Sequence, residues 1–163
     1  HGPGPLPTET DELAPFLSEH NQPNEWQGKV RYGWFDALFT RYALDATGGV
    51  DTLFVTHLDL LSHLKTWRCC TAYGRPLDFD PAFVDCDLSN AVLQNFRLPR
   101  YLPLAQRTQL TQALSEVTPI FETCHPDEQN VIQRIESLTR HPVGLISSGP
   151  SSEDVKLLAP LPL

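Results

Sequence analysis

Residues 52–59 read Thr-Leu-Phe-Val-Thr-His-Leu-Asp, and this stretch decides the expected fold. Its residues 52–56 form a short apolar run, a pattern typical of a buried strand. The run leads directly to His57 and Asp59, so both polar residues follow the carboxyl end of the expected strand. Because open α/β sheets usually place ligands at that end of their strands, the stretch predicts a sheet with a polar binding edge.

Further strands and helices are expected to alternate on both sides of this stretch. Helices are predicted from Trp34 to Gly48-Gly49, which ends the first one, and at 104–116 and 127–140, with one helical turn at 60–64. Strands are predicted at 67–73, 119–122, 143–146 and 154–158. Residues 77–102 lack periodicity, so we expect irregular chain there, with one helical turn near 90–96. The alternation predicts an α/β fold with one mixed sheet of about four to five short strands and flanking helices.

The composition is that of an ordinary globular chain. Among the 163 residues, 40% are apolar and 20% are charged, which excludes a disordered tail or a fibrous protein. No run of 18 apolar residues occurs, so no membrane span is predicted. Twelve basic against twenty acidic side chains give a net charge of −8, which argues against a nucleic-acid partner. We expect a domain at 25–163, preceded by a loose, Pro- and acid-rich arm at 1–24.

Common catalytic and metal-binding motifs are missing from the sequence. It contains no G-x-x-x-x-G-K-[ST] phosphate loop, no G-x-G-x-x-G and no G-x-S-x-G nucleophile elbow. Its four cysteines form no C-x-x-C pair and its histidines no H-E-x-x-H, so no zinc site is predicted. We therefore expect no catalytic residue and no metal ligand, and we interpret the cysteines as reduced thiols of a cytoplasmic protein.

Two groups of residues at expected strand ends are candidates for ligand binding, each with a plainer alternative. The Asp59 carboxylate can accept two hydrogen bonds from guanine, one from N1–H and one from the 2-amino group. The alternative is that Asp59 caps the helical turn that follows it. Ser147, Ser148 and Gly149 form a small polar loop after the strand at 143–146, and the alternative there is a simple strand-exit turn.

Taken together, these segments resemble the C-terminal third of the adenylosuccinate synthetase family. The order and rough spacing agree over 33–73 and 118–158. The match is carried by Gly33-Trp34-Phe35-Asp36-Ala37, Arg41-Tyr42-Ala43, Thr56-His57-Leu58-Asp59, Cys70-Thr71-Ala72-Tyr73, Pro119-Ile120-Phe121-Glu122 and Ser147-Ser148-Gly149-Pro150. The combination is specific, whereas any one of these pieces alone is not.

The resemblance implies a guanine-nucleotide side of an enzyme. The family makes adenylosuccinate from IMP, aspartate and GTP with magnesium. By this resemblance Asp59 contacts the guanine base, and Ser147, Ser148 and Gly149 line the base pocket through backbone groups. The resemblance also places His57 where the family has a lysine that stacks on the base, and makes Arg31 an arginine that helps to hold nucleotide.

The departures from the family pattern lead to two hypotheses. Gly28 and Val30 stand where the family has arginines for anionic substrates, and 77–117 is longer than the usual connection. The family segment with the phosphate loop and the catalytic aspartate and histidine has no counterpart in these residues. The first hypothesis is a degenerate or excised synthetase domain, inactive alone, that binds guanine nucleotide weakly. The alternative is a non-catalytic module that kept the fold and binds a protein partner.

Overall fold

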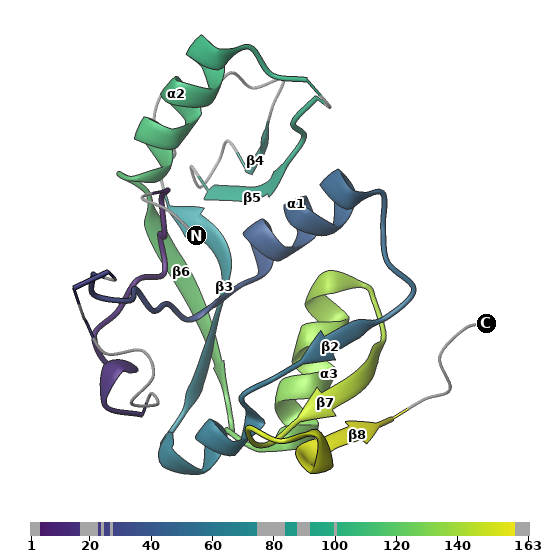
Figure 1. Ribbon diagram of the computed structural model, residues 1–163. Helices are drawn as coiled ribbons and strands as arrows, with labels where there is room; N and C mark the ends of the chain where they lie inside the picture. The colour runs from purple at the N-terminus through teal and green to yellow at the C-terminus, as the bar shows by residue number, and fades with distance from the viewer. Residues whose placement is uncertain are drawn as a thin grey trace. The chain divides into compact units, whose positions relative to one another are not determined.

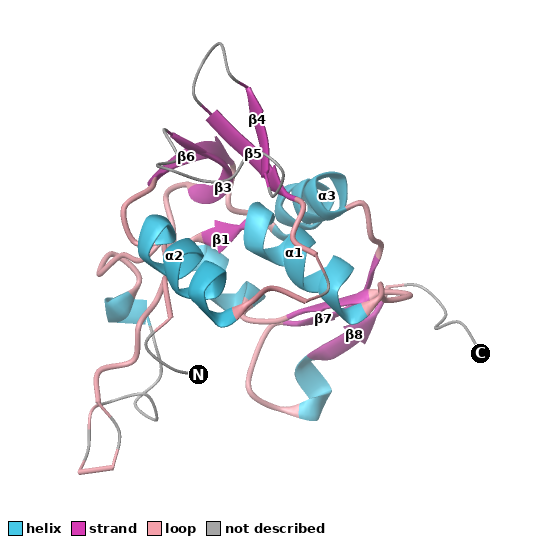
Figure 2. Ribbon diagram, turned by 90° about the horizontal axis from the view of Figure 1, so that it is seen from above, coloured by secondary structure: helices cyan, strands magenta, loops and turns pink. Residues whose placement is uncertain are grey.

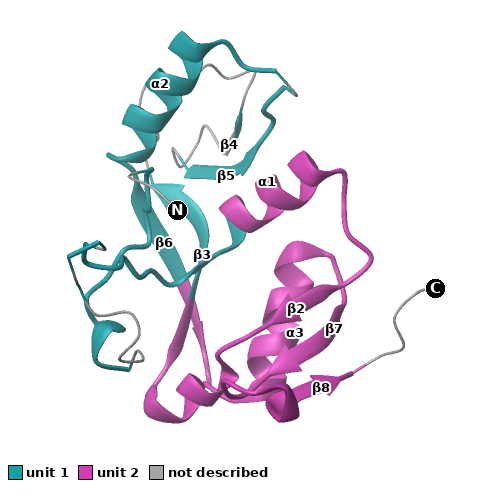
Figure 3. Cartoon of the chain, in the orientation of Figure 1, with its two compact units in different colours: residues 1–38, 69–121 teal, residues 39–68, 122–163 magenta. Residues whose placement is uncertain are grey.

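A computed structural model describes residues 4–16, 23, 25–26, 28–74, 84–87, 92–99 and 101–158. The chain divides into two compact units, and we describe each by itself (Figure 3). Unit 1 comprises residues 1–38 and 69–121, and unit 2 comprises residues 39–68 and 122–163. Within the described ranges, no helix is long and apolar enough to cross a membrane. Unit 1 contains both the expected arm and the chain after it, and the predicted boundary at residue 24 stays a prediction.

Unit 1 is built on a mixed five-stranded sheet. Its strands are β1 (Phe35–Asp36), β3 (Trp67–Gly74), β4 (Val84–Asp87), β5 (Val92–Phe96) and β6 (Thr118–Cys124). Residues 67–68 of β3 and 122–124 of β6 are counted in unit 2. The order is β1-β3-β5-β4, with β6 also paired to β3. β1 runs parallel to β3, whereas β4 and β5 lie side by side as an antiparallel pair (Figure 2). The short helix η1 (Ala14–Phe16) and helix α2 (Leu104–Leu114) complete the unit.

Unit 2 is built on a three-stranded sheet in the order β2-β7-β8. Its strands are β2 (Leu53–Val55), β7 (Val143–Ser147) and β8 (Val155–Leu157). β2 runs parallel to β7, and β8 runs antiparallel to it. Helix α3 (Glu128–Thr139) lies against this sheet (Figure 1). Most of helix α1 (Ala37–Thr47) and the 3-10 helices η3 (Leu58–His63) and η5 (Ser152–Asp154) also belong to the unit.

Helix α3 forms as the sequence predicts. The Asp127 carboxylate accepts a hydrogen bond of 2.9 Å from the backbone N–H of Asn130, which satisfies one of the free donors at the helix start. Val131 and Ile135 lie one turn apart and are buried. The helix ends where Arg140 adopts a left-handed backbone with φ of 61°. The predicted strands at 67–73, 119–122 and 143–146 are confirmed as well, and those at 52–56 and 154–158 are confirmed in a shorter form, at 53–55 and 155–157.

The start of helix α1 differs from the prediction, which placed it at Trp34. Phe35 and Asp36 pair in parallel with Cys69 and Cys70 of β3, so these two residues are strand and the helix begins at Ala37. The predicted end is confirmed, because Gly48 follows the helix with φ of 87°, a conformation that glycine adopts without strain.

Residues 84–96 also differ from the prediction of irregular chain with a helical turn. They contain β4 and β5, and β5 is fixed by the pairing of its Leu93 with Tyr73 of β3. The prediction that 52–56 is a buried strand is wrong for Phe54, which is 52% exposed. Its side chain points to the face opposite that of its half-buried neighbours Leu53 and Val55. The α/β fold class with mixed sheets is confirmed, with the strands divided between two sheets.

Candidate functional site

The parallel pairing of β2 with β7 brings together the two polar segments singled out from the sequence. Val55 at the end of β2 pairs with Ile146 near the end of β7. The chain therefore leaves both strands at the same edge of the sheet, through His57 and Asp59 after β2 and through Ser147–Gly149 after β7. Five of the six predicted binding residues thus lie at one edge of unit 2, as the strand-end argument requires.

Helix η3 presents His57 and Asp59 to solvent. Leu58 and Leu61 are buried and hold the helix on the unit, whereas His57 and Asp59 are exposed. His57 adopts a left-handed backbone with φ of 63° and ψ of 29°, which turns the chain sharply from β2 into η3. Few residues other than glycine take this conformation, and it is more frequent at functional sites than elsewhere.

The alternative explanation of Asp59 as a helix cap is wrong. The N-cap position of η3 is His57, and no side chain makes a capping hydrogen bond there. Asp59 lies inside the first turn, where its backbone carbonyl accepts a hydrogen bond of 2.9 Å from the Ser62 hydroxyl. Its carboxylate has no hydrogen-bond or ion-pair partner among the residues that the structure describes. Both carboxylate oxygens are therefore available to donors of a ligand.

The loop after β7 is held in one conformation by Asp154. The Ser147 hydroxyl donates to the Gly149 carbonyl over 2.8 Å, and the Ser148 N–H donates to the Asp154 carbonyl over 3.2 Å. A Cβ atom at position 149 would lie 2.5 Å from Asp154 Oδ2, so any larger residue there would displace the Asp154 side chain. The Asp154 carboxylate in turn accepts from both the N–H and the hydroxyl of Ser151. These hydrogen bonds lower the pKa of Asp154, so its carboxylate stays ionised where it contacts the loop.

Arg31, the sixth predicted residue, belongs to unit 1 and is engaged within that unit. Its guanidinium donates to Glu9 and to the backbone carbonyl of Gly4. The structure therefore gives Arg31 an acidic neighbour that the sequence analysis did not find. The role of Arg31 in holding nucleotide stays a prediction.

Three further residues, Ser151, Asp154 and Asp36, were missed, although local signals for them exist in the sequence. Ser151 and Asp154 follow the pattern [ST]-x-x-[DE], which is typical of a capping box, and the structure forms that box at η5. Asp36 stands directly before helix α1 and accepts a hydrogen bond of 3.0 Å from the Leu38 N–H, as a helix-capping aspartate does. Its second partner, the Tyr73 hydroxyl at 2.5 Å, comes from β3 and has no local signal.

The described residues offer no cluster for a metal ion. No group of three or more His, Cys, Asp or Glu side chains gathers within the ranges given above. Cys69, Cys70 and Cys124 form no disulfide in the part of the chain that the structure describes, and Cys86 lies where no side chain is described. We therefore assign no magnesium ligand to these residues.

Comparison with known proteins identifies the family. The family model described as adenylosuccinate synthetase matches residues 1–156, including the arm and the segment 77–117 that the sequence analysis had set apart. The adenylosuccinate synthetase of Syntrophotalea carbinolica is 34% identical over 155 residues, which cover 91% of this chain and 33% of that protein. The enzyme of Nitrosomonas eutropha is 32% identical over 157 residues, covering 91% of this chain and 34% of its own length.

A solved structure agrees with the fold. The fully ligated adenylosuccinate synthetase of Plasmodium falciparum superposes with a TM-score of 0.67 at 18% identity, over 97% of this chain and 37% of that one. The chain thus spans about a third of the length of the relatives that it matches. Because the family match extends over nearly all of its residues, the chain belongs to the adenylosuccinate synthetase family.

Proposed function

We propose that this chain is the guanine-nucleotide side of an adenylosuccinate synthetase-like ligase of purine biosynthesis. The proposal rests on one observation, the unpartnered Asp59 carboxylate beside the Ser147–Gly149 loop at a single sheet edge. The two bacterial relatives compared above are adenylosuccinate synthetases, and the chain matches about a third of each. On this proposal the residues form the C-terminal part of such a fold, in a degenerate form, and the protein is cytoplasmic.

The chemistry of this edge fits a guanine base. Asp59 offers two acceptor oxygens to N1–H and to the 2-amino group of guanine. The Gly149 N–H makes no hydrogen bond in the described part of the chain, so it is free to donate to the 6-oxo oxygen. His57 lies two residues before Asp59, where its ring can stack on the base. Adenine has no hydrogen at N1 and no 2-amino group, and it would leave the carboxylate unpaired.

We further propose that the 163 residues alone do not make adenylosuccinate. GTP and magnesium belong to the family reaction, but the sequence has no phosphate-loop motif and the described residues hold no metal cluster. Gly28 and Val30 also replace two arginines that the resemblance assigns to anionic substrates. Without a grip on the phosphates we expect weak nucleotide binding. Formation of adenylosuccinate by the pure chain from IMP, aspartate and GTP would contradict this proposal.

Nucleotide titrations test the base-binding site. NMR shift mapping is carried out with GDP, ADP and XDP, the xanthine nucleotide. GDP should shift the amide signals of residues 147–149, and ADP should bind with at least tenfold lower affinity, since a hydrogen bond to a charged group is worth roughly 1.5–3 kcal/mol. In Asp59→Asn the new amide NH₂ clashes with the 2-amino group of guanine and suits the 2-oxo group of xanthine. The preference should therefore shift from GDP toward XDP.

A matched control separates the base contact from a general change of charge. Asp51 is exposed and precedes β2 at the opposite end of the strand, so Asp51→Asn makes the same charge change away from the site. Its GDP-to-XDP ratio should equal that of the wild type. Absence of binding by the wild type at millimolar ligand would contradict the nucleotide proposal and would favour a partner-binding module.

A further inference from the structure

Residues 8–10 of the arm are bound along residues 32–34 of the same unit. The Thr10 N–H donates to the Tyr32 carbonyl over 2.8 Å, and the Trp34 N–H donates to the Thr8 carbonyl over 3.1 Å. Between these bonds Glu9 and Gly33 form an antiparallel bridge. Thr8 is 1% exposed and lies so close to Gly33 that a Cβ there would be 2.6 Å from the Thr8 hydroxyl oxygen. Backbone pairing and the buried Thr8 therefore anchor the arm.

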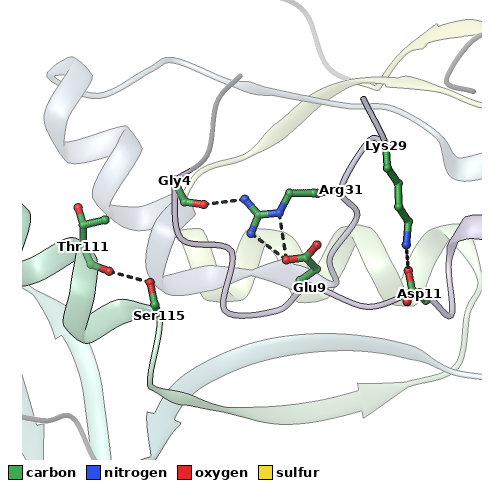
Figure 4. A network of polar contacts seen from close by, with 7 residues as sticks. All are labelled: Gly4, Glu9, Asp11, Lys29, Arg31, Thr111 and Ser115. Carbon is green, nitrogen blue, oxygen red and sulfur yellow. Dashed lines mark hydrogen bonds and ion pairs between the residues drawn. The ribbon is translucent and has the colours of Figure 1, made fainter. Parts of the chain in front are cut away.

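This pairing brings two acidic side chains of the arm into ion pairs with two basic side chains. Arg31 donates from Nε and Nη2 to the same carboxylate oxygen of Glu9, over 3.0 and 2.8 Å, and from Nη1 to the Gly4 carbonyl over 2.7 Å (Figure 4). Lys29 binds Asp11 over 2.5 Å. The hydrogen bond from Arg31 lowers the pKa of Glu9, so Glu9 is ionised at neutral pH. A carboxylate thus occupies the donors with which Arg31 would hold an anionic ligand.

We propose that Glu9 is a built-in competitor that regulates anion binding at Arg31. An anion bearing phosphate oxygens needs the Nε and Nη2 donors, because a guanidinium binds oxyanions through such paired N–H groups. Those donors become free only when the Glu9 carboxylate leaves them. The inference rests on the proposed function in one respect, because it takes the family's role for Arg31, which is to help hold an anionic nucleotide, as the role of this residue.

Release of Glu9 is feasible because the pair is exposed while the arm is anchored elsewhere. The side chains of Arg31 and Glu9 are 36% and 47% exposed, and ion pairs at such positions are weak and screened by salt. The backbone bonds at Thr8 and Thr10 do not involve either charged group. The Glu9 side chain can therefore swing away while residues 8–10 stay in place.

Inorganic pyrophosphate is a suitable probe. Its binding to the full chain is measured by calorimetry in every variant, and also at the Arg31 Nε–H resonance in the variants that keep Arg31. Glu9→Gln keeps the size and an acceptor oxygen but removes the charge, so it should bind pyrophosphate roughly two- to fivefold more tightly than the wild type, the range expected for an exposed ion pair. Glu153→Gln makes the same charge change on an exposed residue of unit 2 and should bind as the wild type does. Adding Arg31→Gln to Glu9→Gln should abolish the gain.

The outcomes separate this inference from the base-binding proposal. Equal pyrophosphate affinity in Glu9→Gln and wild type, an equal gain in Glu153→Gln, or a gain that survives Arg31→Gln would each overturn the competitor role. If Glu9→Gln releases the arm, the Trp34 amide will show it, and the double variant still decides whether Arg31 is the binding group. GDP shifts at residues 147–149 are read independently, so either proposal can fail while the other stands.

Discussion

Asp36 and Asp59 occupy similar places in the sequence and have opposite roles in the structure. Each aspartate lies between a strand and a helix, Asp36 at the end of β1 and Asp59 in the first turn after β2. Asp36 is 9% exposed and accepts hydrogen bonds from the Leu38 N–H and the Tyr73 hydroxyl. Asp59 is exposed and has no side-chain partner among the described residues. A carboxylate at a strand end is available to a ligand only where the fold has not already used its oxygens.

The largest expected effect is on the reactivity of Cys70, which is buried near the negative charge of Asp36. Burial raises the pKa of the Cys70 thiol to about 12, and the negative charge of Asp36 adds to the rise. At pH 8 the thiolate is then roughly a thousandfold rarer than for an ordinary cysteine, and alkylation should slow by a similar factor. Timed iodoacetamide labelling with mass spectrometry measures the rate on the native chain.

Two controls test whether the slow reaction of Cys70 depends on its buried position and on the charge of Asp36. Burial also raises the pKa of the Cys124 thiol, but Cys124 is only half-buried whereas Cys70 is fully buried, so Cys124 is more accessible to the reagent and should react faster. Asp36→Asn removes the nearby charge and should speed the labelling of Cys70, whereas Asp59→Asn should leave it unchanged. Equal rates for Cys70 and Cys124 would contradict the difference in their surroundings.

Removal of the two carboxylates should affect stability very differently. Asp36→Ala leaves the Tyr73 hydroxyl and the Leu38 N–H without this acceptor in a buried place, which should cost about 2–4 kcal/mol of unfolding free energy. Asp59→Ala loses no described side-chain contact and should change it by less than about 0.5 kcal/mol. Urea unfolding followed by circular dichroism gives both values. Similar losses in the two variants would show that Asp59 has a structural role.

The Tyr73 hydroxyl should contribute a smaller share of the same effect. Tyr73→Phe keeps the buried ring and its contact with Phe96 but removes one partner of Asp36, at an expected cost of about 1–2 kcal/mol. Tyr101 is 76% exposed, so Tyr101→Phe is the matched control and should be nearly neutral. A Tyr73→Phe variant as stable as the wild type would mean that Asp36 depends on its other contacts alone.

Local sequence patterns predicted those elements whose determinants are themselves local. Helix α3 has its cap at Asp127 and its buried residues Val131 and Ile135 within a dozen positions, and it was predicted closely. β5 was not, because its strand character is fixed by pairing with Tyr73 and with β4. The same holds for the start of α1, where pairing of Phe35 with Cys69 of β3 extends the strand.

In the candidate site, too, features with local determinants could be predicted from the sequence and features that depend on distant residues could not. The polar residues after β2 and β7 could be predicted to meet, because the ends of parallel strands share one edge. The partner of Arg31 could not, since Glu9 is 22 residues away and reaches it only through the pairing of two irregular segments. The partner of Asp36 likewise comes from β3, 37 residues further along the chain. Sequence patterns thus found the candidate binding residues but not which of them the fold already engages.

A third aspartate, Asp127, lies between the two extremes, and its replacement should have a smaller effect on stability than that of Asp36. It is partly exposed, yet its carboxylate accepts from the Asn130 N–H and contacts the His125 ring at 2.9 Å. The hydrogen bond from the Asn130 backbone lowers the pKa of Asp127. A carboxylate with a lowered pKa in the folded state stabilises the fold above its unfolded pKa and loses that effect as the pH falls through the folded value.

Asp127→Asn keeps a good capping residue without the titrating group, so it should melt only about 1–3 °C below the wild type at pH 7. This difference should shrink in melts at successively lower pH, below about pH 4. Asp127→Ala removes the cap itself and should remain less stable than Asp127→Asn throughout. A gap between the wild type and Asp127→Asn that does not change with pH would show that the cap acts through its shape and not through its charge.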